Sequence, residues 1–372
     1  MGEQVILKAT EGYPELDAYF ADNGIRKVFL VCDSSLPFLA ISGYFDALPE
    51  RGIEVVRFSD FEPNPLYDSV AEGVELFRAS GSDMILAVGG GSAMDVAKCI
   101  KLYANMDPGK NYLEQAQVPN DIKLLAVPTT AGTGSEATRY AVIYYEGEKQ
   151  SVTDDSIIPS AVLMDAGVLT TLPLYQKKAT MLDALCHGIE SFWSVNSTEE
   201  SKKYSAEAIR TIMANKDGYL ANDPAANAAM LYAAHTAGKA INITQTTAGH
   251  AMCYKLTSLF KIAHGHAAAL CDRALIPYMT AHFDRCIDGR GEAYLRATFD
   301  EIAQAMGAKD ADDAGRVFGD LVDSLALTVP EATEEQFAEL KTSVNPVRLK
   351  NHPVALDEDT IDRLYRGMLG SV

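Results

Sequence analysis

Basic residues are scarce in this chain of 372 residues, in which 32 lysines and arginines face 51 aspartates and glutamates, for a formal net charge of −19. A strongly acidic protein repels the phosphates of nucleic acids and anionic membrane surfaces. The composition therefore excludes both as partners. It does not exclude a small anionic substrate, because a local basic pocket can lie within an acidic surface.

The sequence also lacks Cys-x-x-Cys pairs, apolar runs of transmembrane length and a basic-then-apolar start. Its six cysteines are scattered: Cys32, Cys99, Cys186, Cys253, Cys271 and Cys286. Such scatter fits reduced thiols in a cytosolic enzyme better than a disulfide framework. Glu3 and Glu11 stand where a signal peptide would be basic or apolar. We expect a cytoplasmic protein.

The sequence pattern changes near residue 173. The first part has short apolar runs, each followed by Asp, Ser, Gly or Pro, at residues 27–32, 53–58, 84–88 and 123–127. Amphipathic segments such as 67–80 and 93–103 lie between them, and this alternation predicts a parallel sheet covered by helices. From residue 174 onward, alanine-rich helical segments replace the strands. We expect an α/β domain over residues 1–173 and a helical domain over residues 174–372.

Four residues of the second part have the spacing of a metal site. Asp183 and His187 stand four residues apart in a helical segment, so both project from one face. His250 and His264 follow in Gly-His-Ala-Met and Ala-His-Gly-His. One carboxylate and three imidazoles suit iron(II) or zinc and leave room for a substrate oxygen. The sequence does not distinguish the two metals.

Two loops of the first part are typical of phosphate binding. Gly89-Gly90-Gly91-Ser92 follows an apolar run and opens a helix, where glycines let the backbone approach a pyrophosphate. Residues 128–136, Pro-Thr-Thr-Ala-Gly-Thr-Gly-Ser-Glu, follow the next run and supply hydroxyls and glycines. Each could also be an ordinary turn. Asp33, directly after the first run, either caps a helix or accepts hydrogen bonds from an adenosine ribose, which favours NADH over NADPH.

Together these motifs resemble the iron-containing (group III) alcohol dehydrogenases, related in fold to dehydroquinate synthase. The resemblance runs from Pro63 to about His266, and more loosely to Tyr365. It implies a parallel Rossmann-like α/β domain followed by an all-α domain, and a homodimer or larger oligomer. It places Asp183, His187, His250 and His264 on the family's four metal ligands. It also implies cofactor contacts at Gly90, Gly91, Ser92, Asp95, Thr129, Thr130, Thr133 and Lys149.

The chain departs from the family pattern at two positions. Ala93 replaces the usual proline after Gly-Gly-Gly-Ser, and Tyr254 replaces a histidine that often lies beside the nicotinamide. The second change puts a proton relay through that position in doubt. Tyr254 and His266 are the candidate proton donors, although His266 could instead only neighbour the metal ligands or the cofactor.

Longer segments resemble the family branch that reduces phosphonoacetaldehyde to 2-hydroxyethylphosphonate. They are residues 180–187, 193–201, 237–250, 254–258 and 264–267. The resemblance implies hydride transfer from NADH to an aldehyde polarised by the metal. Binding a phosphonate group requires cations and hydrogen-bond donors. The candidates are Lys239, Asn242, Thr246 and Lys255, with Arg139, Lys178 and Thr244 as further groups.

Three other readings remain open. The same chemistry could act on a neutral substrate such as lactaldehyde or a diol. A lyase or cyclase like dehydroquinate synthase would cycle NAD internally and consume no NADH. A nucleotide sensor or metal store would bind metal tightly without turning over any aldehyde. The phosphonate dependence of turnover separates the first reading from the leading one.

Overall fold

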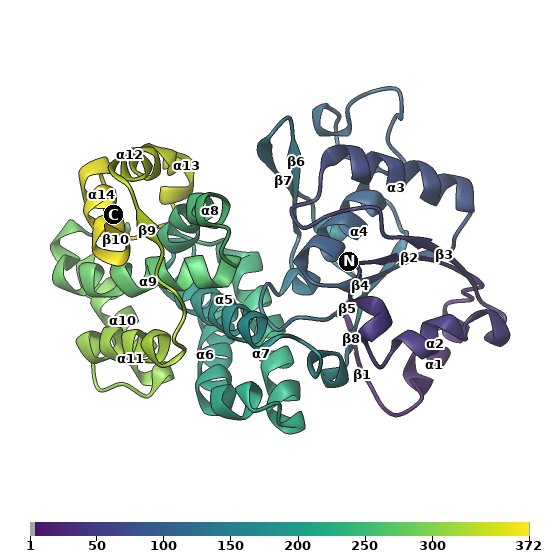
Figure 1. Cartoon of the computed structure of the whole chain (residues 1–372), viewed down its shortest axis with the longest axis horizontal. Coiled ribbons are helices and arrows are strands. Elements are labelled where there is room, and N and C mark those ends of the chain that lie inside the picture. Colours follow the sequence, from purple (N-terminus) through teal and green to yellow (C-terminus); the bar gives the residue numbers. More distant parts are fainter. Residues whose placement is uncertain (1–3, 372) are drawn as a thin grey trace. The chain divides into compact units, whose positions relative to one another are not determined.

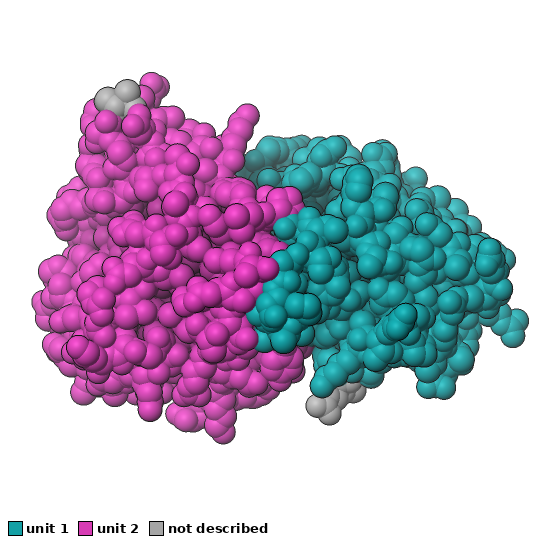
Figure 2. Space-filling view, turned by 60° about the horizontal axis from the view of Figure 1, so that its bottom comes forward, with its two compact units in different colours: residues 1–172, 222–231 teal, residues 173–221, 232–372 magenta. Residues whose placement is uncertain are grey.

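The computed structural model describes residues 4–371, which fall into two compact units (Figures 1 and 2). The first unit runs to Leu172 and also includes residues 222–231, and the second comprises residues 173–221 and those from Tyr232 onward. The sequence analysis expected a boundary after residue 173 but not the grouping of residues 222–231 with the first unit. Within residues 4–371, no helix combines enough length with a sufficiently apolar surface to cross a membrane.

A six-stranded parallel sheet forms the centre of the first unit, with the strand order β1-β8-β5-β4-β2-β3. The strands are β1 (Val5–Lys8), β2 (Lys27–Cys32), β3 (Glu54–Phe58), β4 (Met84–Gly89), β5 (Lys123–Pro128) and β8 (Ala161–Met164). The register pairs Val28 with Met84 and Ala87 with Ala126. A separate antiparallel hairpin joins β6 (Tyr140–Tyr145) to β7 (Glu148–Thr153). The sheet and the helical second unit confirm the expected fold class.

Apolar side chains cover both faces of this sheet, because successive residues of a strand point to opposite sides. Phe29 and Ile85 share one buried cluster with residues of α3 (Tyr67–Ser80) and α4 (Gly91–Tyr103). Figure 1 shows α3 and α4 on one side of the sheet and α1 (Pro14–Asp22) and α2 (Ser42–Asp46) on the other. Helices on both faces explain why the central strands are almost continuously apolar.

The strand order reverses between β2 and β4. From β2 the chain continues outward to β3, whereas from β4 it continues in the opposite direction to β5. Ligands of open parallel sheets bind beyond the carboxyl ends of the strands at such a reversal. Asp33 follows β2 and Gly90 follows β4, so the fold itself places both predicted cofactor residues at this point.

The second unit is built almost entirely from helices. They are α5 (Leu174–Trp193), α6 (Glu199–Leu220), α7 (Pro224–Thr244), α8 (Ala248–Phe260), α9 (His264–Ala281), α10 (Glu292–Met306), α11 (Ala311–Ser324), α12 (Glu334–Ser343), α13 (Pro346–Leu349) and α14 (Glu358–Met368). The first turns of α7 belong to the other unit. Every residue of α5 from Met181 to Trp193 is buried, and α5 packs against α6 and α9. A helix buried on all sides must find partners for any polar side chain that it carries.

Candidate metal centre and cofactor-binding loops

Three polar side chains share one face of the buried helix α5. Asp183, His187 and Glu190 are separated by four and three residues, so they project from the same side. Their exposed fractions are 2%, 5% and 0%. Burying a polar group without a compensating partner costs roughly 2–7 kcal/mol. These residues therefore need neighbours that bind them.

His250, on α8, completes a compact cluster with Asp183 and His187. One ligand atom from each residue lies within 4.8 Å of the other two, and the two imidazole rings stack with centroids 4.5 Å apart. Asp183 Oδ1 and His250 Nε2 face each other at 3.5 Å. Among the described residues, neither atom has a hydrogen-bond partner. A divalent ion fits this donor set, because carboxylate oxygen and imidazole nitrogen both bind one.

His264 lies at the edge of this cluster as the first residue of α9. Its ring centroid is 5.3 Å from that of His250, and its side chain is half-buried. The structure thus brings all four predicted ligands together, three in the tight group and His264 beside it. Their role as ligands stays a prediction.

Two glycines allow the helices to approach closely enough for this arrangement. A Cβ atom at Gly265 would lie 2.0 Å from the Ala179 carbonyl oxygen and 2.5 Å from Asp183 Cβ. A Cβ atom at Gly249 would lie 2.1 Å from Asp272 Oδ1 and 2.7 Å from Glu190 Oε1. Any larger residue would push α9 or α8 away from α5, so these glycines hold the neighbouring histidines close to Asp183.

Glu190 fixes the orientation of His250 from the side opposite the cluster. Its Oε1 contacts His250 Nδ1, and its Oε2 accepts hydrogen bonds from the Thr247 backbone N–H at 2.5 Å and the Thr247 hydroxyl at 2.6 Å. Trp193 Nε1 donates to that hydroxyl at 2.8 Å. Since Nδ1 is engaged by Glu190, Nε2 is the ring nitrogen turned toward Asp183. Carboxylates commonly orient metal-binding histidines in this way.

The charges of the cluster follow from burial and mutual attraction. Burial raises the pKa of Asp183, but the charge of His187 and the neighbouring His250 imidazole outweigh it and hold the pKa below its usual range. Burial lowers the pKa of His250, but the charge of Glu190 and the contact with Asp183 raise it to about 10. An ionised Asp183 is suited to a cation, and metal binding would release the proton of His250.

Asp272, on α9, is a second buried carboxyl group beside Glu190. It is fully buried, and burial followed by the negative charge of Glu190 raises its pKa well above the ordinary value. Two buried carboxyl groups so close cannot both ionise readily. The protonated form of Asp272 is therefore favoured, and the negative charge of the pair lies mainly on Glu190, which faces His250.

The two candidate proton donors lie in different surroundings. The Tyr254 ring stacks on that of His264, with centroids 5.5 Å apart, and its hydroxyl accepts a hydrogen bond from Arg348 Nη1 at 3.1 Å. His266 is buried, its Nδ1 lies 3.2 Å from the Tyr175 hydroxyl, and burial lowers its pKa. Their part in proton transfer stays a prediction.

The two lysines expected to bind the substrate anion contact residues of other helices, α12 and α6. Lys255 Nζ forms an ion pair with Glu339 on α12. Lys239 Nζ lies 5.8 Å from the centroid of the Tyr204 ring on α6. These contacts neither support nor contradict a role in substrate binding. The ion pair with Glu339 partly neutralises the charge of Lys255.

The break between α7 and α8 positions the neutral candidates. Gln245 has a left-handed backbone with φ of 59°, and α7 ends just before it at Thr244. Thr246 follows in the break, and its carbonyl oxygen accepts a hydrogen bond from Asn351 Nδ2 at 3.3 Å. Asn242 is half-buried on the last turn of α7. The helix break that the predicted substrate site requires is thus present.

In the first unit, Asp33 faces the glycine loop. Its Oδ2 accepts a hydrogen bond from the Gly90 N–H at 3.4 Å, and its Oδ1 accepts from the Ser35 N–H and hydroxyl at 2.9 and 2.5 Å. The carboxylate therefore stabilises its own turn, one of the two roles expected of it. Its contact with Gly90 also places it at the reversal of strand order, where a ribose role stays a prediction.

The two predicted phosphate loops lie against each other. A Cβ atom at Gly90 would lie 3.4 Å from Thr130 Cγ2, and one at Gly91 would lie 3.1 Å from Thr133 Cγ2. The Thr129 N–H donates to the Gly89 carbonyl at 3.0 Å. No side chain caps the start of α4 at Gly90, so the N–H groups of its first turn, including half-buried Ser92, are available to an anion.

A buried lysine connects these two loops through its hydrogen bonds. Lys98 is 0% exposed, and its Nζ donates to Ser135 Oγ at 2.9 Å, Thr138 Oγ1 at 3.1 Å and the Tyr140 carbonyl at 2.7 Å. Ser135 Oγ in turn donates to Asp95 Oδ1 at 3.1 Å. Lys98 thus connects α4 to the second loop.

Asp95 and Lys149 belong to the same electrostatic group. Burial raises the pKa of Asp95 to about 6, and the charges of Lys98 and Lys149 oppose that rise. The positive charge of Lys149, on β7, therefore acts on the carboxyl group of Asp95. Their contact with a cofactor stays a prediction.

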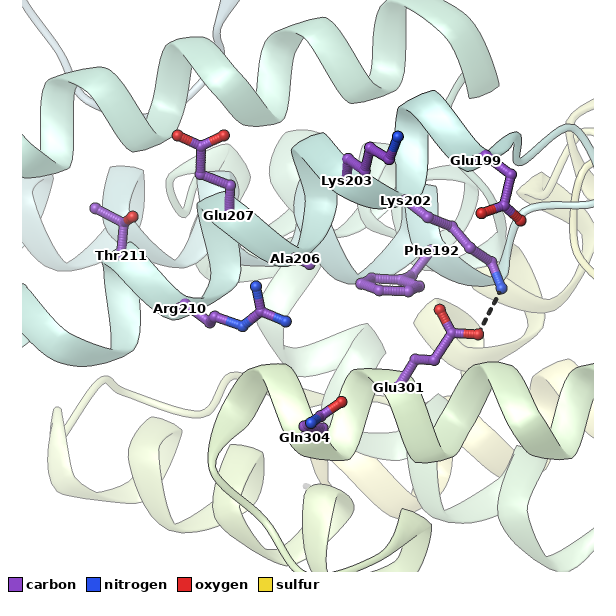
Figure 3. Close-up of a pocket in the computed structure, with 10 residues that line it drawn as sticks. All are labelled: Phe192, Glu199, Lys202, Lys203, Ala206, Glu207, Arg210, Thr211, Glu301 and Gln304. Atoms are coloured by element: carbon purple, nitrogen blue, oxygen red, sulfur yellow. Dashed lines mark hydrogen bonds and ion pairs between the residues drawn. The ribbon is translucent and has the colours of Figure 1, made fainter.

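A surface cavity of about 610 Å³ lies elsewhere in the second unit, between α6 and α10 (Figure 3). Lys202 and Arg210 of α6 line it together with Glu301 and Gln304 of α10. Lys202 Nζ lies 3.1 Å from Glu301 Oε1 and also donates to Thr298, so its charge is neutralised. None of the candidate metal or cofactor residues lines this cavity.

Comparisons with known proteins agree with this geometry. The family model described as "Iron-containing alcohol dehydrogenase" matches residues 6–166, and the one described as "Fe-containing alcohol dehydrogenase family, C-terminal" matches residues 177–368. The first match covers most of the parallel α/β unit, and the second covers most of the helical unit. The chain belongs to the iron-containing alcohol dehydrogenase family, and it is an oxidoreductase of that family.

Individual relatives act on different substrates. The chain is 34% identical over 312 residues to the phosphonoacetaldehyde reductase of Streptomyces viridochromogenes, covering 80% of this chain and 79% of that protein. It is 31% identical over 269 residues to the NAD-dependent methanol dehydrogenase of Bacillus methanolicus, covering 69% and 68%. The solved sulfoacetaldehyde reductase of Bifidobacterium kashiwanohense, in complex with NAD+, superimposes with a TM-score of 0.86 at 26% identity, covering 98% and 96%.

Three residues that lie at these sites, Glu190, Lys98 and Arg348, were not predicted from the sequence. Glu190 could have been found, because it follows His187 by three residues on the same helical face. Lys98 could have been found in the same way, because it follows Asp95 by three residues on the same helical face. Arg348 gave no local signal, since 94 residues separate it from its partner Tyr254.

Proposed function

We propose that the protein reduces phosphonoacetaldehyde to 2-hydroxyethylphosphonate. In this reaction NADH gives a hydride to the carbonyl carbon, a proton adds to the carbonyl oxygen, and NAD+ and the alcohol leave. The buried cluster of Asp183, His187 and His250 carries the proposal of a metal-assisted reduction. The phosphonate substrate is supported by the 34% identical reductase and by the similar fold of an enzyme for another anionic two-carbon aldehyde.

Asp183, His187, His250 and His264 would hold the metal, for which we propose iron(II), with zinc as the alternative that the same ligands accept. When bound, the metal supplies Lewis acidity toward the carbonyl oxygen. Glu190 contributes by holding the His250 ring in one orientation. The raised pKa of Asp272 favours its neutral form, which limits the negative charge of the buried pair.

The first unit would hold NADH at the reversal of strand order. The N–H groups at the start of α4 would receive the pyrophosphate, and the hydroxyls of Thr130 and Thr133 lie against the same loop. Asp33 would accept hydrogen bonds from the adenosine ribose and would repel a 2′-phosphate, which favours NADH over NADPH.

A proton must reach the reduced oxygen. Burial raises the pKa of the Tyr254 hydroxyl above its ordinary value, so this group is protonated at neutral pH. The hydroxyl belongs to the residue whose ring stacks on His264. Tyr254 Oη is therefore the donor that we favour, and His266 is the alternative.

A second candidate function is the same reduction with a neutral short-chain aldehyde, such as lactaldehyde. The resemblance to a methanol dehydrogenase favours it.

The six cysteines are all free thiols, which supports an enzyme of a reducing compartment, the cytoplasm, under either candidate.

The test is an anaerobic assay of the iron(II)-loaded protein that follows the loss of NADH absorbance. Phosphonoacetaldehyde is compared with acetaldehyde, propionaldehyde and lactaldehyde. We expect kcat/KM to favour the phosphonate by about a hundredfold or more, roughly 3 kcal/mol of transition-state discrimination. Equal or faster turnover of the neutral aldehydes would establish the second candidate instead.

A further inference from the structure

An arginine from the C-terminal segment lies next to the metal cluster. Arg348, on α13, donates from Nη1 to the Tyr254 hydroxyl at 3.1 Å, and its Cζ lies 4.8 Å from the centroid of the Tyr254 ring. That ring stacks on His264. A single aromatic ring therefore separates the guanidinium group from a candidate metal ligand.

Arg348 has no carboxylate partner within residues 4–371, and its side chain is only half-buried. The other cations considered for the substrate are engaged differently. Lys255 pairs with Glu339, and Lys178 donates to the Leu325 carbonyl at 2.8 Å. A guanidinium group that has no carboxylate partner can bind an external anion.

The segment that carries Arg348 is fastened to the break between α7 and α8. Asn351 Nδ2 donates to Gln245 Oε1 at 2.8 Å and to the Thr246 carbonyl at 3.3 Å. The Val195 N–H donates to the Asn351 carbonyl at 3.0 Å. These bonds hold the arginine in place before any ligand arrives, which reduces the entropy lost on binding.

The dimensions of the substrate select this arginine among the cations. Only two carbon atoms connect the phosphonate of phosphonoacetaldehyde to its aldehyde oxygen, so the anion must bind close to the metal ligands. A buried or half-buried dianion needs a cation and hydrogen-bond donors. Guanidinium offers two parallel N–H groups to two oxygens of a tetrahedral anion.

We infer that Arg348 forms the subsite for the phosphonate group of the substrate. This inference rests on the proposed function and names the group that gives it specificity. It assigns to Arg348 the role for which the sequence suggested Lys239 and Lys255. The same chemistry would accept a sulfonate, which is also a tetrahedral oxyanion but carries one charge fewer.

The test compares Arg348→Gln and Arg348→Lys with the wild-type protein, each loaded with iron(II). Lys350→Gln is the matched control, because it removes one positive charge from an exposed position of the same segment. We expect Arg348→Gln to lower kcat/KM for phosphonoacetaldehyde by about a hundredfold more than it lowers kcat/KM for acetaldehyde. Arg348→Lys should restore part of the loss, and Lys350→Gln should match the wild type.

A binding measurement keeps this inference separate from the proposed function. Ethylphosphonate, which has no carbonyl group to reduce, is titrated calorimetrically into the metal- and NAD+-loaded wild type and Arg348→Gln. Weaker binding to the variant supports the subsite even if the wild type shows no preference for phosphonoacetaldehyde, an outcome that would refute only the proposed function. Equal binding to both proteins, or an equal loss of activity with both aldehydes, would overturn the role of Arg348.

Discussion

Replacing Lys98 with methionine should both destabilise the first unit and weaken NADH binding. Methionine keeps most of the volume but removes a charged donor of three hydrogen bonds, to Ser135, Thr138 and Tyr140. Hydrogen bonds from charged groups contribute roughly 1.5–3 kcal/mol each, although they do not add fully. The change also removes a positive charge that acts on the buried carboxyl group of Asp95. We expect the free energy of unfolding to fall by about 3–5 kcal/mol, measured by urea denaturation.

The contribution of Asp95 to the free energy of unfolding depends on pH in a defined direction. The pKa of Asp95 in the folded protein is about 6, above its ordinary value of 3.8, so the folded state holds the proton more tightly than the unfolded state. The contribution of Asp95 to stability is therefore greatest below pH 3.8 and is lost as the pH rises through about 6. Removing Lys98 raises this pKa further, which should extend the loss toward neutral pH.

Lys101→Met is the matched control for this prediction. Lys101 is also buried, and its Nζ donates to Asn120 Oδ1 at 3.0 Å and to the carbonyls of Asn120 and Ile122 at 3.0 and 2.7 Å, away from the cofactor loops. Both variants should lose stability, but only Lys98→Met should raise KM for NADH, by about tenfold. An unchanged KM in Lys98→Met, or the same rise in both, would refute the view that Lys98 aligns the two loops.

Three further substitutions test other residues of the account. Asp33→Gly should raise kcat/KM with NADPH relative to NADH, because the carboxylate that repels a 2′-phosphate is gone; an unchanged preference would remove Asp33 from the cofactor site. His264→Ala should lose both bound metal and activity, and full metal content by elemental analysis would contradict its role as a ligand. Tyr254→Phe should lower kcat by about a hundredfold while metal content stays the same; an unchanged kcat would leave His266 as the proton donor.

The central sheet could be predicted because buried parallel strands are continuous apolar runs. β2, β4 and β5 have this signature, whereas the edge strand β3 carries Glu54 and Arg57 among its apolar residues; turn residues close all four runs. The strands β1 and β8 have only four residues each, and β1 forms the edge of the sheet, so neither stood out. The hairpin β6–β7 was missed because its strands pair with each other outside the main sheet.

The metal cluster was predictable to a different degree at each position. Asp183 and His187 share a helical face, and local spacing alone reveals this. Their approach to His250 depends on how α5, α8 and α9 pack, which local spacing does not encode and which the family resemblance supplied. Arg348 depends on the same tertiary packing, but no motif marked it.

The most direct test of the whole account measures metal content and NADH-dependent aldehyde reduction in the same samples. Wild-type protein is stripped by chelation, reloaded anaerobically with iron(II), and compared with His250→Ala. We expect one bound metal per chain, NADH oxidation with phosphonoacetaldehyde only after reloading, and neither property in the variant. Full turnover by the stripped protein, or metal-dependent turnover that His250→Ala retains, would contradict the proposal that this cluster forms the catalytic metal centre.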